Sequence, residues 1–262
     1  MIDLHCHILP GVDDGPPTLE DTLALARMQA ALGVRRVLAT PHVSWDMPTT
    51  SAQVAEGVAA VNAALREHAV PVEVLPGGEI AITRAAELDD VELRALRLGG
   101  GPWILVESPL TPSAQGFDNV LRHLQARGHR IVLAHPERCP AFIREPERLA
   151  SLVHEGMLTS ITAGALVGRF GGTVTRYAHE LVRDGLVHNV ASDAHDTRRR
   201  PPGMRDELWE AGYGEHADWW CDEVPAAIVG GGEIPHPPPA PLPVRRRRGG
   251  LGGLLRRASS PR

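Results

Sequence analysis

Short apolar runs recur along the chain and are separated by longer segments in which apolar residues return every three or four positions. The short runs are rich in β-branched and aliphatic residues, as strands are, and they lie at residues 1–6, 34–40, 72–75, 103–107, 131–134, 158–162 and 187–191. Regular alternation of seven strands with helices predicts parallel strands that are joined by helical crossovers.

The first of these helices has the clearest start signal. Thr18 stands before the apolar stripe and Asp21 follows three positions later, which resembles a capping box. Gly33 follows the stripe and predicts where the helix ends.

Side chains that can bind metal ions follow six of the seven predicted strands. No Gly-x-Gly-x-x-Gly follows the first strand, so the sequence does not indicate a dinucleotide-binding open sheet. In a β/α barrel the carboxyl ends of the strands converge on one rim, where catalytic groups collect. We therefore predict a barrel whose mouth gathers these side chains, namely His5, His7, Asp13 and Asp14 after the first strand, His42 after the second, Glu79 after the third, Glu107 at the end of the fourth, His135, Glu137 and Arg138 after the fifth, and Asp193 and His195 after the seventh.

The crowding of so many imidazoles and carboxylates predicts that cations bind between them. Mixed shells of this kind suit zinc, manganese or iron, and the number of ligands implies several ions. Residues i and i+2 of a strand point to the same side, so His5 and His7 can hold one ion while Cys6 points into the core.

Other polar residues are expected to have supporting or solvent-exposed positions. Asp13 is expected to hydrogen-bond the backbone that follows it, and Glu137 to orient Arg138 or a ligand imidazole. Asp196 either supports His195 or begins an exposed loop with the sequence DTRRRPPG. The remaining histidines are expected to face solvent, and they are His68, His123, His129, His154, His179, His188, His216 and His236.

Composition and charge fit a soluble globular protein and narrow its partners. The chain of 262 residues is 43% hydrophobic and 23% charged, and it has no long apolar run and no secretory signal, so we expect a cytoplasmic protein. Three cysteines at unrelated spacings predict no disulfide framework. The net charge of −5, with seven arginines and no acids in residues 237–262, leaves −12 for residues 1–236, which argues against nucleic-acid binding.

The end of the chain differs in composition from the rest. Residues 236–262 are rich in proline, then in arginine and glycine, which predicts a disordered tail beside a folded domain of residues 1–235. Arginines beside the apolar segment GLGGLL could contact an anionic membrane, although solvated disorder is the commoner outcome.

Five motifs, in this order and at these separations, resemble the polymerase and histidinol phosphatase (PHP) superfamily. They are DLHCHILPGVDDGP, TPH, GGEI, HPERC and SDAH, and the resemblance covers roughly residues 1–235. Within the superfamily the chain looks most like the CpsB/CapC group of bacterial metal-dependent protein-tyrosine phosphatases.

The resemblance implies a distorted seven-stranded TIM-like β/α barrel, the PHP fold, with a trinuclear metal centre that often contains manganese. One ion would bind His5, His7, Glu79 and Asp193, and Glu79 would bridge to a second ion that also binds Glu107 and His135. A third ion would bind Asp14, His42 and His195, and Arg138 would contact the substrate phosphate.

The resemblance also implies hydrolysis of phosphotyrosine by a metal-activated hydroxide, on a bacterial tyrosine kinase that regulates capsule or exopolysaccharide synthesis. Two alternatives stay open: a small-molecule phosphomonoesterase such as histidinol phosphatase, and a PHP-fold binding module without catalysis. A cysteine-based tyrosine phosphatase is excluded, because that chemistry needs arginine six positions after the cysteine, and Val12, Glu145 and Ala227 stand there.

Overall fold

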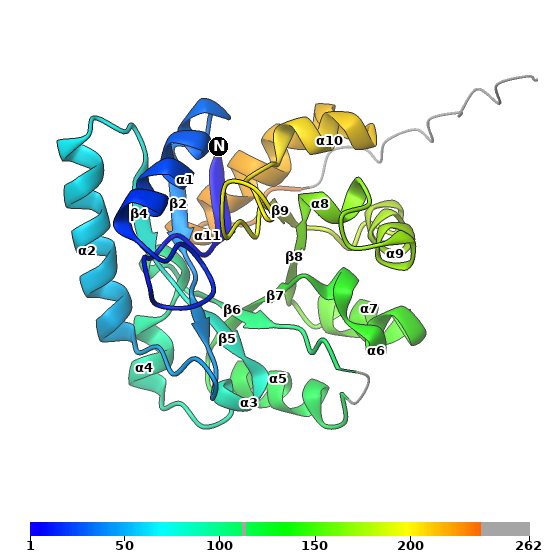
Figure 1. The fold of residues 1–262 in the computed structure, drawn as a ribbon. Helices are drawn as coiled ribbons and strands as arrows, with labels where there is room; N and C mark the ends of the chain where they lie inside the picture. Colours follow the sequence, from blue (N-terminus) through cyan, green and yellow to red (C-terminus); the bar gives the residue numbers. More distant parts are fainter. Residues whose placement is uncertain (112–113, 237–262) are drawn as a thin grey trace, which may run out of the picture.

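The computed structural model describes residues 1–111 and 114–236, which form a β/α barrel (Figure 1). All strand pairs are parallel, in a three-stranded sheet of order β1-β2-β4 and a six-stranded sheet of order β3-β5-β6-β7-β8-β9. The strands are β1 (Ile2–Cys6), β2 (Arg36–Ala39), β3 (His42–Val43), β4 (Glu73–Pro76), β5 (Glu79–Ala81), β6 (Trp103–Glu107), β7 (Arg130–Ala134), β8 (Leu158–Thr162) and β9 (Asn189–Ala191).

The seven predicted strands are confirmed, but the second and third are each broken into two. The second continues from β2 to β3 across Thr40 and Pro41, and the third continues from β4 to β5 across Gly77 and Gly78. Proline has no N–H to donate to a ladder, and a Cβ on Gly77 would lie 3.3 Å from the carbonyl oxygen of Ala39. These breaks make the barrel distorted, as predicted.

The ends of the two sheets meet between β1 and β9. A parallel bridge joins Cys6 to Ala194, and the His7 amide donates to the Ala194 carbonyl at 2.9 Å. The Asp193 amide donates in turn to the His5 carbonyl at 2.9 Å. The first and last strands therefore hold their ligand-bearing ends side by side.

Helices surround the strands on the outside of the barrel (Figure 1). The first begins as predicted, because the Thr18 hydroxyl accepts a hydrogen bond from the Asp21 amide at 3.2 Å. The helices are α1 (Leu19–Ala31), α2 (Ser51–Glu67), α3 (Ile82–Ala85), α4 (Asp90–Ala95), α5 (Phe117–Ala126), α6 (Pro140–Arg144), α7 (Pro146–His154), α8 (Ala163–Leu166), α9 (Gly172–Arg183), α10 (Arg205–Ala211) and α11 (Val224–Gly230).

One continuous apolar cluster fills the space between strands and helices. It includes the fully buried side chains Leu4, Leu38, Ile80 and Leu105. The three cysteines are buried and form no disulfide, so Cys6 packs in the core as predicted. Burial of this apolar surface is the main contribution to the stability of the barrel.

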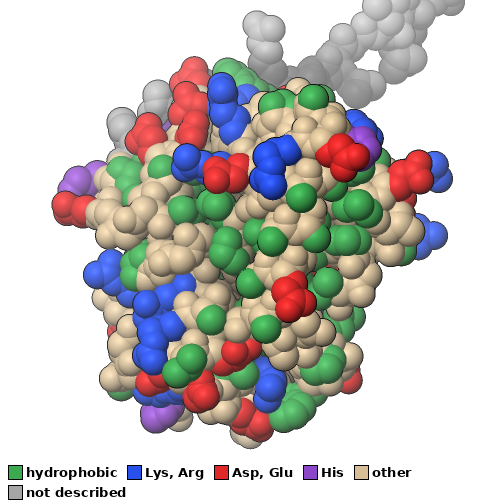
Figure 2. Space-filling view, turned by 90° about the vertical axis from the view of Figure 1, so that its left-hand side faces the viewer, with side chains coloured by type: hydrophobic (Ala, Val, Ile, Leu, Met, Phe, Trp, Pro, Cys, Tyr) green, Lys and Arg blue, Asp and Glu red, His purple; other side chains and the backbone are tan. Residues whose placement is uncertain are grey.

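The outer surface carries charges of both signs. On the face that includes α2, acidic and basic side chains are interspersed between neutral and apolar ones (Figure 2). No helix of the described residues is long and apolar enough to cross a lipid bilayer. The predicted tail begins at residue 236, and its residues 237–262 lie outside the described residues. The boundary at residue 235, the disorder of the tail and its membrane contact therefore stay predictions.

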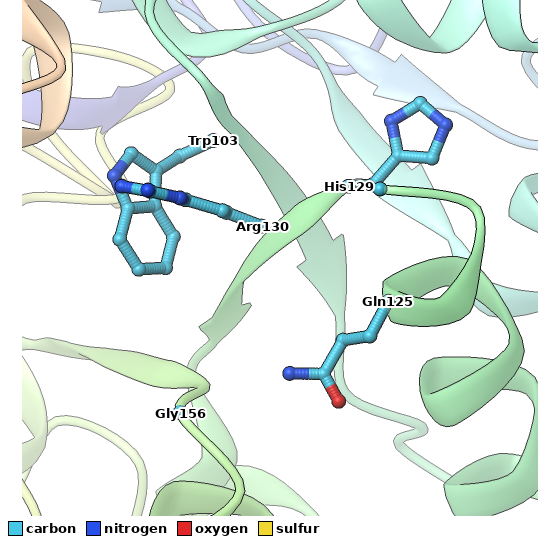
Figure 3. A pocket seen from close by; sticks show the side chains of 6 residues that line it. Trp103, Gln125, His129, Arg130 and Gly156 are labelled. Carbon is cyan, nitrogen blue, oxygen red and sulfur yellow. The ribbon is translucent and has the colours of Figure 1, made fainter.

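The amino-terminal end of the barrel has a hollow of its own. It has a volume of about 440 Å³, and the Arg130 guanidinium stacks 5.6 Å above the Trp103 ring (Figure 3). Trp103 and Arg130 open β6 and β7, so this hollow lies at the opposite end of both strands from Glu107 and His135.

Candidate metal centre

The carboxyl ends of the strands bring together all nine predicted metal ligands. Their nitrogen and oxygen atoms form four groups, and within each group these atoms lie within 4.8 Å of one another. The groups are His7, Asp14, His42 and His195; His5, His7 and Asp193; His5, Glu79 and His135; and His42, Glu79 and Glu107. Glu107 thus lies with His42 and Glu79, whereas the resemblance implies an ion shared by Glu79, Glu107 and His135.

Glu79 lies at the middle of the cluster. Its Oε1 is 2.6 Å from His135 Nε2, and its Oε2 is 3.2 Å from His5 Nε2 and 3.3 Å from His7 Nε2. His42 Nδ1 lies 3.1 Å from the same Oε2. One carboxylate therefore faces four imidazoles, which is the position that a bridging ligand requires.

Asp193 joins the imidazoles to two arginines. Its Oδ1 lies 3.5 Å from the Nε2 atoms of both His5 and His7. Its Oδ2 accepts hydrogen bonds from Arg138 and Arg200, each at 2.6 Å. One oxygen of the Asp193 carboxylate therefore faces two imidazoles, and the other accepts from two guanidinium groups.

The donor set fits divalent cations. Glu79 Oε2 and Asp193 Oδ1 are buried without hydrogen-bond partners, and such groups are costly unless a cation or donor compensates them. His5 Nε2 and His7 Nε2 lie only 3.3 Å apart, as two ligands of one ion would. Imidazole and carboxylate together suit manganese, iron or zinc, so the residues present match the predicted ions.

Burial and neighbouring charges set the protonation of the cluster. Burial opposes ionisation of Glu79, but His5 and His135 outweigh it and hold the pKa of Glu79 well below its usual value. Burial and the Glu79 charge raise the pKa of Glu107 to about 7. Burial and the Arg138 charge lower the pKa of His135 to about 4, which keeps that imidazole in the neutral form that binds metals.

Two of the nine side chains project from unusual backbone. His135 has φ 34° and Asp193 has φ 52°, and Ala69 is the only other non-glycine residue with positive φ in the described ranges 1–111 and 114–236. Positive φ is uncommon for residues with a Cβ and is concentrated at functional sites. The strained conformation turns both side chains into the cluster at the points where β7 and β9 end.

Asp13 supports the cluster and is more than a turn residue. Its Oδ1 accepts from the Gly15 amide at 3.0 Å, as the sequence predicts. Its Oδ2 also lies 2.6 Å from His7 Nδ1 and accepts from the His42 amide at 3.0 Å. The Asp13 carboxylate therefore fixes the His7 ring so that Nε2 faces the other ligands.

The expectations for Glu137, His129 and His188 are wrong. The buried Glu137 carboxylate accepts from the Thr162 amide at 2.9 Å, and no hydrogen bond joins it to Arg138 or a cluster imidazole within the described residues. His129 was expected to face solvent, but it is buried and lies 3.0 Å from Asp90 at the start of α4. His188 is also partly buried, and its Nδ1 accepts from the Thr159 amide at 3.2 Å.

Arg200 is the site residue that sequence reasoning missed. Asp196 Oδ1 accepts from the amides of Arg198 and Arg199, each at 2.5 Å, and the His195 amide donates to the Arg200 carbonyl at 3.0 Å. This turn directs Arg200 back to Asp193 and to His195 Nε2, which lies 2.7 Å away. The available signal was Asp196, because an aspartate often accepts hydrogen bonds from amides two and three positions later and so forms a turn, here at Arg198 and Arg199.

Arg138 donates to the same Asp193 oxygen as Arg200 and packs against Phe170, whose ring centroid is 4.7 Å from the guanidinium carbon.

Side chains cover the cluster unevenly, so solvent reaches part of it. Asp14, Arg200 and His42 have side chains that are 46%, 31% and 20% exposed, whereas those of His5, Glu79 and Asp193 are at most 2% exposed. The side of Asp14 and His42 is therefore open to a substrate.

A parallel β/α barrel with imidazole and carboxylate groups gathered at the carboxyl ends of its strands defines a metallohydrolase type of site. Residues 1–216 match the family model described as capsular polysaccharide synthesis, CpsB/CapC, and the chain belongs to this family.

Relatives of this family are similar over most of the chain. The tyrosine-protein phosphatase YwqE of Bacillus subtilis is 34% identical over 95% of this chain and 98% of its own length. The putative tyrosine-protein phosphatase CapC of Staphylococcus aureus is 28% identical over 77% of this chain and 79% of its own.

Solved structures agree with this assignment. One solved structure is described as belonging to YwqE from Bacillus subtilis and CpsB from Streptococcus pneumoniae, unique metal-dependent tyrosine phosphatases. It matches this chain with a TM-score of 0.80 and 32% identity, over 92% of this chain and 99% of its own. A β-aspartyl dipeptidase from Fervidobacterium islandicum shares the fold alone, with a TM-score of 0.52 and 13% identity over 87% of this chain and 72% of its own.

Proposed function

We propose that the protein is a metal-dependent protein-tyrosine phosphatase that hydrolyses the phosphate ester of phosphotyrosine. The observation that carries the proposal is a cluster of nine side chains that can bind metal ions, with two arginines that donate to Asp193 within it. Relatives that cover almost the whole chain are named as tyrosine-protein phosphatases, which supports the same reaction.

The proposed cofactor is manganese, in about two to three ions, with iron or zinc as alternatives of the same ligand preference. His5, His7, Asp14, His42, Glu79, Glu107, His135, Asp193 and His195 would hold the ions. When bound, such ions supply Lewis-acid chemistry and lower the pKa of water toward neutrality.

The chain's own residues bind and orient the phosphate. Arg138 and Arg200 both donate to Asp193 Oδ2, and their planar guanidinium groups could hold non-bridging phosphate oxygens through paired hydrogen bonds. Phe170 fixes the Arg138 guanidinium from one face, and Asp13 fixes the His7 ring. The partly exposed side at Asp14 and His42 leaves room for the tyrosyl group to face solvent.

The proposed substrate is a phosphotyrosine protein, namely a bacterial tyrosine kinase that regulates capsule or exopolysaccharide synthesis. The family description, capsular polysaccharide synthesis, supports this partner. We further propose a cytoplasmic location, a catalytic domain of residues 1–235 and a separate tail of residues 236–262.

The test measures metal content and phosphotyrosine-peptide turnover on one preparation of the full chain. We expect at least about two ions per chain and turnover that is lost on chelation and restored by manganese. Histidinol phosphate is the comparison substrate. A higher kcat/KM for histidinol phosphate would favour the small-molecule phosphatase, and bound metal without turnover of either substrate would favour the binding module.

A further inference from the structure

A rigid turn stands beside the accessible side of the cluster. The turn of residues 44–47 begins two residues after His42, the Ser44 amide donates to the Met47 carbonyl at 3.0 Å, and the Met47 amide donates to Ser44 Oγ at 3.0 Å. An antiparallel bridge between Val43 and Pro48 closes its base. The tip of this turn therefore has a fixed position relative to His42.

Trp45 occupies that tip and is 57% exposed. The Arg84 guanidinium carbon lies 4.6 Å from the centroid of the Trp45 ring, which is the distance of a cation–π contact. Arg84 belongs to α3, which directly follows β5 and Glu79. The aromatic ring and the cation thus come from the two segments that follow ligand-bearing strands.

The position of Trp45 distinguishes it from other exposed apolar side chains. Single exposed apolar residues are common and need no explanation. Trp45, however, lies in the turn that follows His42 and β3, and His42 is one of the cluster side chains that solvent reaches. Leu110 is also exposed, at 46%, and it lies three residues after Glu107. The segment that follows β6 therefore has an exposed apolar side chain as well.

A hollow lies at the base of the same turn. It has a volume of about 460 Å³ and is lined by Gly11 and Val12, which precede Asp13, by Pro48 and Thr49, which follow the turn, and by residues of α2. This hollow continues from the base of the turn along α2.

We propose that Trp45 and Arg84 form a binding surface for the polypeptide that flanks the phosphotyrosine, with preference for acidic residues next to it. This inference rests on the proposed function. Residues 1–236 have a net charge of −12, which repels acidic peptides. The Arg84 side chain is 27% exposed and lies 3.8 Å from the Glu87 carboxylate, and an acidic residue of the peptide would share this guanidinium with Glu87. The Trp45 ring offers a large rigid contact at little entropic cost, as aromatic residues do at protein interfaces.

The test compares two substrates of one reaction, a phosphotyrosine peptide with aspartates on both sides and phenyl phosphate, which has no flanking chain. For Trp45→Ala we expect the ratio of kcat/KM for the peptide to kcat/KM for phenyl phosphate to fall about 5- to 30-fold, mainly through KM. For Arg84→Gln we expect a fall of about 3-fold or more with the acidic peptide, and a smaller fall when lysines replace the aspartates.

Trp209→Ala is the matched control, because Trp209 is 58% exposed on α10 and its ring packs against Gly214. The control should keep the wild-type ratio. Metal content of each variant separates a local effect from damage to the centre. An unchanged ratio in Trp45→Ala, or the same loss on both substrates, overturns the proposal. Wild-type protein that hydrolyses phenyl phosphate but not the peptide refutes the proposed function itself and this inference with it.

Discussion

The two ends of the barrel contain the same residue types in opposite settings. At the amino-terminal end, His129 and Arg127 share the Asp90 carboxylate, and His188 Nδ1 accepts from the Thr159 amide at 3.2 Å. At the carboxyl end, Glu79 and Asp193 have buried oxygens without hydrogen-bond partners, although several imidazoles surround them.

This difference separates structural histidines from ligand histidines. A structural histidine has a hydrogen-bond partner on a neighbouring segment, as His129 has through Nε2 and His188 through Nδ1, although His129 Nδ1 is buried without one. The carboxyl-end histidines converge with each other and with acids, an arrangement that a protein alone stabilises poorly. Convergence of several ring nitrogens is therefore more informative about function than burial of any one ring.

The largest expected effect comes from removing a histidine that belongs to two of the four groups. His7→Gln should lower the metal content and reduce phosphotyrosine turnover by more than about 100-fold, because even residues behind the ligands cost 10- to 100-fold in metal affinity or activity when changed. His129→Gln is the control from the amino-terminal end and should keep both. Elemental analysis and turnover check this, and normal metal content in His7→Gln would contradict it.

Arginines give the second comparison. Arg138→Ala should lower kcat/KM about 100-fold while the metal content stays unchanged, because it removes a donor to the phosphate and no ligand. Arg130→Ala, at the amino-terminal hollow, should keep wild-type kinetics. Steady-state kinetics on metal-loaded protein would decide, and unchanged turnover in Arg138→Ala would remove it from the site.

Two aspartates that hold histidines give the third comparison. Asp13→Asn should weaken metal affinity about 10- to 100-fold, because the carboxylate fixes the His7 ring. Asp90→Asn should lower the stability but not the metal affinity, because its partners Arg127 and His129 are structural. Metal titration and urea unfolding of both variants measure the two effects, and equal metal affinity in the two variants would argue against a role for Asp13.

The smallest effect concerns pH. Burial lowers the pKa of His188 from 6.5 to about 4, so the folded state favours the neutral ring. The contribution of His188 to the free energy of unfolding is therefore complete above pH 6.5. It is lost as the pH falls toward 4, and the loss is at most about 3 kcal/mol. Urea unfolding at pH 7 and pH 4.5 should show a smaller loss in His188→Gln than in the wild type, and identical losses would contradict this assignment.

Strand positions and ligand types could be predicted from the sequence because both depend on local pattern. The ends at Glu107 and Thr162 match the predicted strand ends, since each apolar run stops there. The breaks at Thr40–Pro41 and Gly77–Gly78 were not predicted, because they depend on how two neighbouring strands change sheets.

Residues whose role depends on tertiary packing were harder to predict. Arg200 stands in an arginine-rich loop that resembles a solvated one, and only the turn at Asp196 directs it to Asp193. Glu137 adjoins Arg138 and lies two residues after His135, yet its carboxylate accepts a hydrogen bond from Thr162 at the end of β8. Neighbourhood in sequence was a poor guide for both.

The unpartnered oxygens of Glu79 and Asp193 have a consequence outside catalysis. Any cation that binds between them stabilises the folded chain in proportion to the logarithm of its concentration. Metal starvation would then shorten the lifetime of the protein in the cell, because cellular proteases remove chains that unfold more often. The abundance of the protein, as well as its activity, would follow the supply of the ion.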